Sequence, residues 1–194
     1  GDVWLDGGYL GDTEGYFVPH AFEVTGALRG RSGHALAVEV TCNASRDPHG
    51  KRNITGVFQS GDHVDGAGNP GGIWRPVRVT ETGPVRIASL RVLCEDASPT
   101  RAVLVLRAVL DSDGARRVRL RTEVGPLDHE VDQPLAAGPN EVNWTVTVER
   151  PGLWWPRALG DPVLHDMRVA VMAGDGDGEA PSDERRLRTG LRSV

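Results

Sequence analysis

Apolar and polar residues alternate with a period of two along most of this 194-residue chain. Residues 116–124 are the clearest case, because valine, leucine and threonine there alternate with arginine and glutamate. The spacing of an amphipathic helix fails in nearly every window. Since successive side chains of a strand point to opposite faces, the pattern predicts strands with one buried face. The chain is therefore expected to be all-β.

Residues 89–194 carry the pattern of one small sandwich. Turn residues such as Asp111-Ser112-Asp113-Gly114 separate short alternating runs, which is typical of an antiparallel immunoglobulin-like domain. These runs predict strands at residues 89–94, 101–110, 116–124, 141–149, 164–172 and 185–192. We therefore expect an immunoglobulin-like β-sandwich over residues 89–194.

Residues 1–88 form a less regular β unit in this interpretation. Val3-Trp4-Leu5 enters the turn Asp6-Gly7-Gly8, and a hairpin is predicted there because glycine tolerates positive φ. Residues 41–71 are irregular and rich in Asn, Asp, Gly and His, and an irregular stretch of this length is usually functional or disordered. Further short strands are expected at residues 22–24, 35–40, 73–75, 77–79 and 85–87.

Charge and hydropathy exclude two classes of partner. A net charge of −5 and an isoelectric point near 5.7 lack the basic footprint of a nucleic-acid binder. No run approaches the length of an apolar membrane-spanning helix, so no membrane partner is expected. All basic residues except Lys51 are arginine, which favours a GC-rich, bacterial genome as the source. No targeting stretch follows Gly1, which says nothing about secretion, and a cytoplasmic location is the working expectation.

The motifs of common catalytic and cofactor sites are missing from the sequence. It contains no nucleophile elbow, phosphate loop or dinucleotide fingerprint. The six histidines have no metal-ligand spacing, and the acidic run at 175–179 lacks the pattern of a calcium loop. Cys42 and Cys94 are interpreted as two free thiols, although a disulfide stays open. No metal and no cofactor are therefore expected.

Asn140-Glu141 is the one pair that resembles the acid/base carboxylate of a retaining glycosidase. That role needs a second carboxyl group about 5–5.5 Å away in a pocket. Here the pair follows Gly138-Pro139 at the start of an expected strand. We interpret it as part of a turn, and we predict no catalytic residue in this chain.

Two features could recognise a sugar. The loop at 47–70 is rich in aspartate, asparagine and histidine, whose oxygens and nitrogens can bind hydroxyls in pairs. A solvated loop is the simpler interpretation for any one of these residues. Trp154 and Trp155 could stack on a sugar ring, but filling a seam between domains is the favoured interpretation.

Several segments, taken in their order along the chain, resemble glycoside hydrolase family 2. They are Val3–Gly11, Gly33–Val38, Gly72–Val77, Leu153–Pro156 and Arg188–Arg192. Together they resemble the sugar-binding domain and the following immunoglobulin-like domain of this family of β-galactosidases, β-mannosidases and β-glucuronidases. Asp6 and His34 depart from the pattern, because the family usually has asparagine at both positions.

The resemblance implies a fold in two parts. Residues 1–88 would be the C-terminal part of a sugar-binding, galactose-binding-like jelly roll without its first strands, and residues 89–194 the immunoglobulin-like sandwich. The α/β barrel with both catalytic carboxylates is absent and would follow Val194. A jelly roll without its first strands exposes sheet edges, so a homo-oligomer is one expected way to cover them.

The resemblance also implies a function. The chain would be a non-catalytic accessory region of a retaining β-glycosidase, inactive alone, that lends a sugar-contacting loop to the hydrolysis of terminal β-glycosides. The family's pattern places substrate contacts at Asp65 and at Asn69, three positions before Gly72. Asp62 is a second candidate for the aspartate. Which sugar is bound cannot be read from this chain.

Two other functions stay open. A stand-alone carbohydrate-binding module would bind sugar in isolation, but Trp74 is the only tryptophan near the loop. A purely structural pair of β domains would bind no sugar at all.

Overall fold

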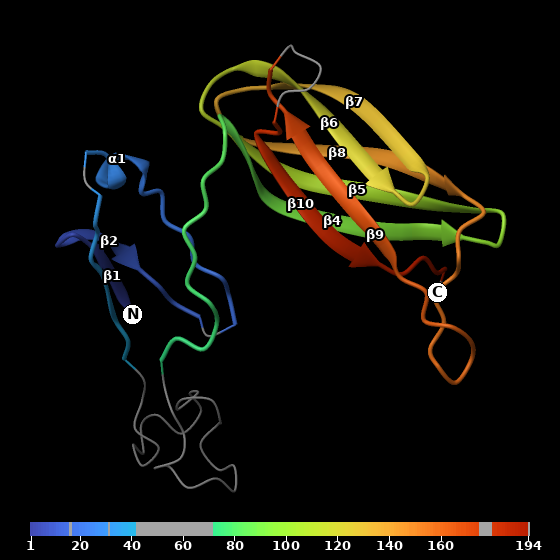
Figure 1. Ribbon diagram of the computed structural model, residues 1–194, viewed down its shortest axis with the longest axis horizontal. Helices are drawn as coiled ribbons and strands as arrows, with labels where there is room; N and C mark the ends of the chain where they lie inside the picture. The colour runs from blue at the N-terminus through green and yellow to red at the C-terminus, as the bar shows by residue number, and fades with distance from the viewer. Residues whose placement is uncertain (16, 31, 42–71, 175–179, 194) are drawn as a thin grey trace, which may run out of the picture. The chain divides into compact units, whose positions relative to one another are not determined.

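The computed structural model describes residues 1–15, 17–30, 32–41, 72–174 and 180–193. Its regular structure is antiparallel strand with one short helix, so the expected all-β fold class is confirmed (Figure 1). The chain forms two compact units, Gly1–Arg78 and Val79–Val194, called unit 1 and unit 2 below.

The structure divides the chain ten residues before the boundary expected at residue 88. The reason is strand β4 (Val85–Ala97), which runs through that boundary with a bulge between Ile87 and Ser89. Val85 and Ile87 are fully buried in the core of unit 2. The short strand expected at 85–87 is therefore the beginning of a longer one.

Unit 1 contains a three-stranded sheet in the order β2-β1-β3. Its strands are β1 (Asp2–Leu5), β2 (Gly8–Asp12) and β3 (Leu36–Glu39). The predicted hairpin of β1 and β2 is confirmed, and its turn residues Asp6 and Gly7 have φ angles of 52° and 82°. The strands expected at 22–24, 73–75 and 77–79 do not form, and a short helix, α1 (Thr25–Leu28), follows the first of these segments.

The described part of unit 1 encloses very little core. Val3 and Leu5 are its only buried hydrophobic residues among those described, and both lie on one face of β1. Large hydrophobic side chains are instead exposed at Tyr9, Phe17, Val18, Leu36, Val40, Ile73, Trp74 and Val77. A three-stranded sheet with so little apolar cover is marginal on its own.

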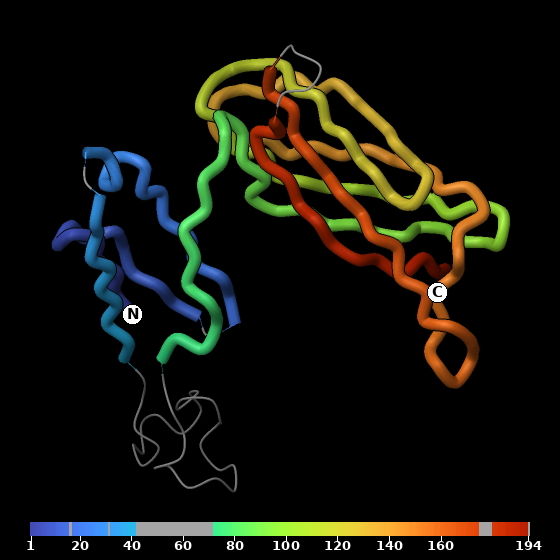
Figure 2. The backbone as a smooth tube through the Cα atoms, viewed as in Figure 1, coloured from blue at the N-terminus to red at the C-terminus, as the bar shows by residue number. Residues whose placement is uncertain are grey.

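Unit 2 is a sandwich of two antiparallel sheets (Figures 1 and 2). The first sheet has the order β4-β5-β8, with β5 at Arg101–Ser112 and β8 at Gly138–Glu149. The second has the order β10-β9-β6-β7. Its strands are β6 (Arg116–Val124), β7 (Leu127–Leu135), β9 (His165–Met172) and β10 (Asp183–Thr189).

The core of unit 2 lies between the inward faces of its two sheets. Leu104 and Leu106 of β5 are fully buried, as are Leu120 of β6 and Val169 of β9. Strand β7 was not predicted from the sequence, because its alternating face is only half-buried and only Leu135 is buried. Seven strands in two antiparallel sheets match an immunoglobulin-like sandwich. Its fourth strand, β7, pairs with β6, whereas the constant type places the fourth strand in the sheet of the first two.

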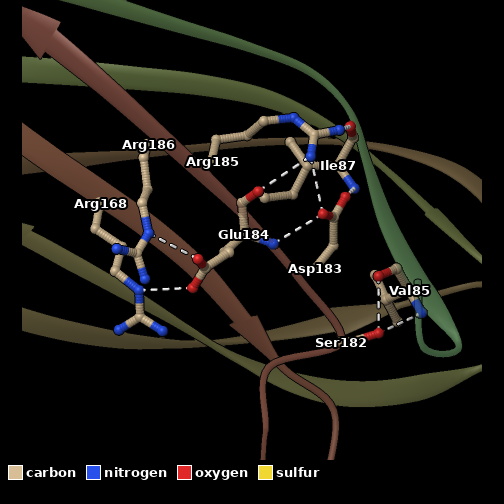
Figure 3. A network of polar contacts seen from close by, with 8 residues as sticks. All are labelled: Val85, Ile87, Arg168, Ser182, Asp183, Glu184, Arg185 and Arg186. Atoms are coloured by element: carbon tan, nitrogen blue, oxygen red, sulfur yellow. Dashed lines mark hydrogen bonds and ion pairs between the residues drawn. The ribbon is translucent and has the colours of Figure 1, made fainter. Parts of the chain in front are cut away.

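Side chains of Ser182 and of β10, which begins at the next residue, link the edges of the two sheets in unit 2 (Figure 3). The Ser182 hydroxyl accepts a hydrogen bond from Val85 N and donates one to Val85 O, both at 2.8 Å. Next along the edge, Ile87 N donates to an Asp183 carboxylate oxygen at 2.7 Å, and the Arg185 guanidinium donates to Ile87 O. These bonds satisfy backbone groups of edge strand β4 that would otherwise be unpaired.

Candidate functional site

The predicted sugar-contacting residues Asp62, Asp65 and Asn69 lie outside the described residues. The description resumes at Gly72, whose φ of +122° lies in the region that favours glycine. Ile73 and Trp74 follow directly, with 56% and 47% of their surfaces exposed. The part of the candidate site that the structure describes is therefore the segment from Gly72 to Arg75.

Trp74, which follows the predicted loop in the sequence, contacts an aromatic ring and a guanidinium group. The Trp74 ring meets the Phe17 ring edge-on, with 5.9 Å between the ring centroids and 79° between the planes. The Arg75 guanidinium lies 4.3 Å from the centroid of the Trp74 ring, within the range of a cation–π interaction. Two neighbours thus hold Trp74, which lies five positions after Asn69 in the sequence.

The two residues that depart from the family pattern contact each other. An Asp6 carboxylate oxygen lies 2.7 Å from His34 Nδ1, and the other accepts a hydrogen bond from Ala35 N at 2.8 Å. Asp6 N also donates to Ala35 O at 2.8 Å. The β1–β2 turn is therefore tied to the residues just before β3, which the separate positions in the sequence did not indicate.

Asn140 makes the turn contacts that its sequence position suggested. Its side-chain oxygen accepts a hydrogen bond from Ala136 N, and its amide nitrogen donates to Ala136 O and Gly138 O. The amide is thus engaged in holding the β7–β8 turn. Glu141, the next residue, is exposed on β8.

Charged residues cover the outer face of the β10-β9-β6-β7 sheet and pair across strands. Arg168 of β9 donates to Glu123 of β6 and to Glu184 of β10, each at 2.7 Å. Hydrogen bonds from Arg186 and Arg168 lower the pKa of Glu184, and the bonds that Arg168 makes raise its own pKa. These arginine and glutamate side chains pair with one another across the strands, so we interpret their role as structural.

Trp154 and Trp155 pack against the last described residues of unit 2. Trp154 N donates to Leu191 O at 2.9 Å, and a side chain on Gly190 would collide with the Trp154 ring. The Arg192 guanidinium lies 5.1 Å from the centroid of the Trp155 ring and 5.9 Å from that of Trp154. The contact of Arg192 was not predicted from the sequence, because nothing in its neighbours along the chain indicates the stacking.

Other site chemistry is sparse in the described part of the chain. No group of three or more His, Cys, Asp or Glu residues there could hold a metal ion. No helix among these residues is long and apolar enough to cross a membrane. Cys94 is a half-buried free thiol, whereas Cys42 lies outside the described residues.

Comparison of the sequence with known proteins finds a relative that aligns with nearly all of this chain, although the chain matches only part of that relative. No protein-family model matches the chain. Beta-mannosidase B from Aspergillus oryzae is 27% identical over 208 aligned residues, which cover 96% of this chain and 24% of that protein. The chain therefore spans about a quarter of the length of this curated relative.

Comparison of the structure with solved structures gives the same picture for the fold. A β-D-mannosidase from Dictyoglomus thermophilum aligns over 100% of this chain and 26% of its own, with a TM-score of 0.75 and 18% identity. A β-glucuronidase from glycoside hydrolase family 2 aligns over 99% of this chain and 21% of its own, with a TM-score of 0.72 and 15% identity. These two likenesses establish the arrangement of strands.

Proposed function

This chain is related to the β-glycosidases of glycoside hydrolase family 2, and from this premise we propose that it is a non-catalytic accessory region of such an enzyme. Unit 1 would be the later part of the sugar-binding jelly roll, and unit 2 the immunoglobulin-like domain. The catalytic α/β barrel would follow Val194, and the whole enzyme would hydrolyse terminal β-glycosides.

One observation carries the proposal. Nearly all of this chain aligns with a β-mannosidase, yet it accounts for only 24% of that protein. A single accessory region would give this result, because its whole length has a counterpart while most of the enzyme does not.

We further propose that Asp65 and Asn69 contact the sugar in the active site, with Asp62 as the alternative aspartate. An ionised aspartate can accept two hydroxyl protons, and a site built to hydrogen-bond a hydroxyl rejects a sugar that lacks it. Arg75 and Phe17 support the proposal indirectly, because they hold Trp74 just after this segment.

The test uses the full-length protein that contains this chain and a panel of 4-nitrophenyl β-glycosides. Asp65→Asn is expected to lower kcat/KM by about 10- to 150-fold, since a hydrogen bond to a charged group contributes about 1.5–3 kcal/mol. Asn69→Ala is expected to lower it by about two- to tenfold, since a neutral hydrogen bond contributes about 0.5–1.5 kcal/mol. Asp166→Asn is the matched control, because Asp166 is an exposed carboxylate of unit 2. An unchanged kcat/KM for both loop variants would favour the purely structural function.

The isolated chain, residues 1–194, separates the remaining alternatives. It is expected to hydrolyse none of the glycosides, because the proposal places both catalytic carboxylates elsewhere. Turnover by the isolated chain would contradict the proposal. Sugar binding by the isolated chain, measured by calorimetry, would instead favour a stand-alone carbohydrate-binding module.

A further inference from the structure

Unit 2 gathers exposed apolar side chains on one loop. Among its described residues, large hydrophobic side chains are exposed at Val79, at Leu93 and at four positions between 155 and 164. These four form what we call the Trp155 surface: Trp155 (38% exposed), Leu159 (68%), Val163 (36%) and Leu164 (41%). Such a concentration on a single loop marks an interaction site more often than scattered exposed residues do.

The loop that carries the Trp155 surface is held in shape by its own contacts. Trp155 N donates to Asp161 O at 2.9 Å, and Leu159 N donates to Pro156 O at 2.7 Å. Trp154 forms an isolated antiparallel bridge with Pro162. A side chain on Gly160 would press against the Trp155 side chain at about 3.0 Å. The apolar residues are therefore presented by an ordered loop, which reduces the entropy lost on binding.

Arg192 adds an unsatisfied charge beside the same loop. Its guanidinium lies over the Trp154 and Trp155 rings, which fixes its position. Its Nε is buried and has no hydrogen-bond partner, and among the described residues it forms no ion pair. The Arg192 side chain as a whole is only half-buried, so a carboxylate brought by another surface can pair with the terminal nitrogens of its guanidinium.

The place where the chain leaves unit 2 indicates what covers this surface. Leu191 is fully buried and hydrogen-bonded to Trp154, so the segment after it starts beside the loop (Figure 1). The relative that aligns with nearly all of this chain is about four times longer. A domain joined directly after residue 194 would meet the Trp155 surface at a high effective concentration.

We propose that the Trp155 surface is the docking site of the domain that follows this chain, and that Arg192 pairs there with a carboxylate of that domain. The proposal rests on the proposed function, under which a catalytic domain follows Val194. It adds a specific interface: an apolar patch against Trp155 and Leu159, with an acidic residue opposite Arg192.

Photo-crosslinking in the full-length protein tests the occupant. Leu159→p-benzoylphenylalanine is expected, after irradiation and digestion, to give crosslinked peptides from beyond residue 194. The control is Leu93→p-benzoylphenylalanine, since Leu93 is 42% exposed on β4 and does not belong to the loop that carries the Trp155 surface. Crosslinks from position 159 that stay within residues 1–194, join two copies, reach another protein or fail to form would each overturn the proposal, as would an equal yield from position 93.

A charge reversal tests the part assigned to Arg192. Arg192→Glu is expected to raise the rate of thermolysin cleavage between unit 2 and the following domain by about tenfold, which corresponds to about 1.4 kcal/mol. Arg117→Glu is the control, because Arg117 is exposed at the end of β6 that lies away from the start of β9. Equal cleavage rates for the two variants would overturn the role of Arg192.

Glycosidase activity of the same preparations separates the two proposals. An active enzyme without the expected crosslinks would refute the docking site and leave the proposed function standing. Crosslinks to a following domain in a protein inactive on every β-glycoside tested would do the reverse.

Discussion

Ser182 and Val85, 97 positions apart, exchange two hydrogen bonds in a buried contact between the edges of the two sheets of unit 2. A single hydroxyl serves as acceptor for the Val85 N–H and as donor to the Val85 carbonyl. Gly83 lies against the same serine, because a side chain on Gly83 would come within 2.7 Å of the hydroxyl oxygen. At this edge of the sandwich, the Ser182 hydroxyl thus makes the two hydrogen bonds to Val85 that a neighbouring strand would otherwise make.

Removing that hydroxyl should destabilise unit 2. Ser182→Ala leaves a buried N–H and a buried carbonyl without partners, which costs about 1–3 kcal/mol for each unsatisfied group. We expect the free energy of unfolding, measured by urea denaturation, to fall by about 2 kcal/mol or more. Thr145→Ala, on the exposed face of β8, is the control and should change it by about 0.5 kcal/mol or less. Equal values for the two variants would show that Val85 finds other partners.

The core contains a second buried polar pair, Trp144 and Thr122. Trp144 Nε1 donates to the Thr122 hydroxyl at 3.0 Å between the two sheets. Thr122→Val keeps the shape of the side chain but removes the acceptor, so the indole N–H is left buried and unpaired. The expected loss of stability is about 1–3 kcal/mol in the same urea assay. A more stable variant would mean that Trp144 shifts to another acceptor.

Acid should weaken unit 2 through Glu184. Hydrogen bonds from Arg186 and Arg168 place its folded pKa below the ordinary value of 4.5. A carboxylate with a lowered pKa stabilises the fold above its unfolded value, and this contribution is lost as the pH falls through the folded pKa. Glu184→Gln lacks the contribution, so its urea midpoint should fall less than that of the unmodified protein between about pH 6 and pH 3. Glu149→Gln serves as control, and a Glu184→Gln profile parallel to that of the unmodified protein would contradict the assignment.

In unit 1, the Asp6 side chain should control the start of β3. Asp6→Ala removes the acceptor for Ala35 N and the partner of His34, whereas Asp6→Asn keeps an oxygen for Ala35 N. Asparagine also tolerates the positive φ at this position better than alanine does. We expect hydrogen exchange of the Ala35 amide to accelerate by about tenfold in Asp6→Ala and by less in Asp6→Asn. Equal acceleration in the two variants, both of which lack the charge, would show that the charge of Asp6, and not its geometry, holds the turn.

The isolated chain should self-associate. Its unit 1 exposes Phe17, Leu36 and Ile73 among other large hydrophobic residues, while only Val3 and Leu5 of its described residues are buried hydrophobics. Light scattering of residues 1–194 is expected to report a mass above that of one 20.9 kDa chain. A stable monomer with a high melting temperature would instead mean that unit 1 covers these residues itself.

Local patterns were sufficient for most strands, because a half-buried strand records its buried face in every second residue. The strand at residues 116–124 was predicted with its observed bounds for this reason. Strand β7 was missed, since its neighbours bury only Leu135 and leave the rest of its alternation half-exposed. The helix α1 was missed because four residues without a buried face carry no periodic signal.

By itself, the sequence determined the all-β class, the hairpin at Asp6-Gly7 and the resemblance that led to a family, because each depends on residues close together in the chain. Only the tertiary structure decided that Ser182 reaches Val85, that Asp6 meets His34 and that Arg192 stacks on two tryptophans. These contacts join residues far apart in sequence, and strand pairing and sheet packing bring them together. A pattern of alternating residues shows which face of a strand is buried, but it does not specify what lies opposite that face.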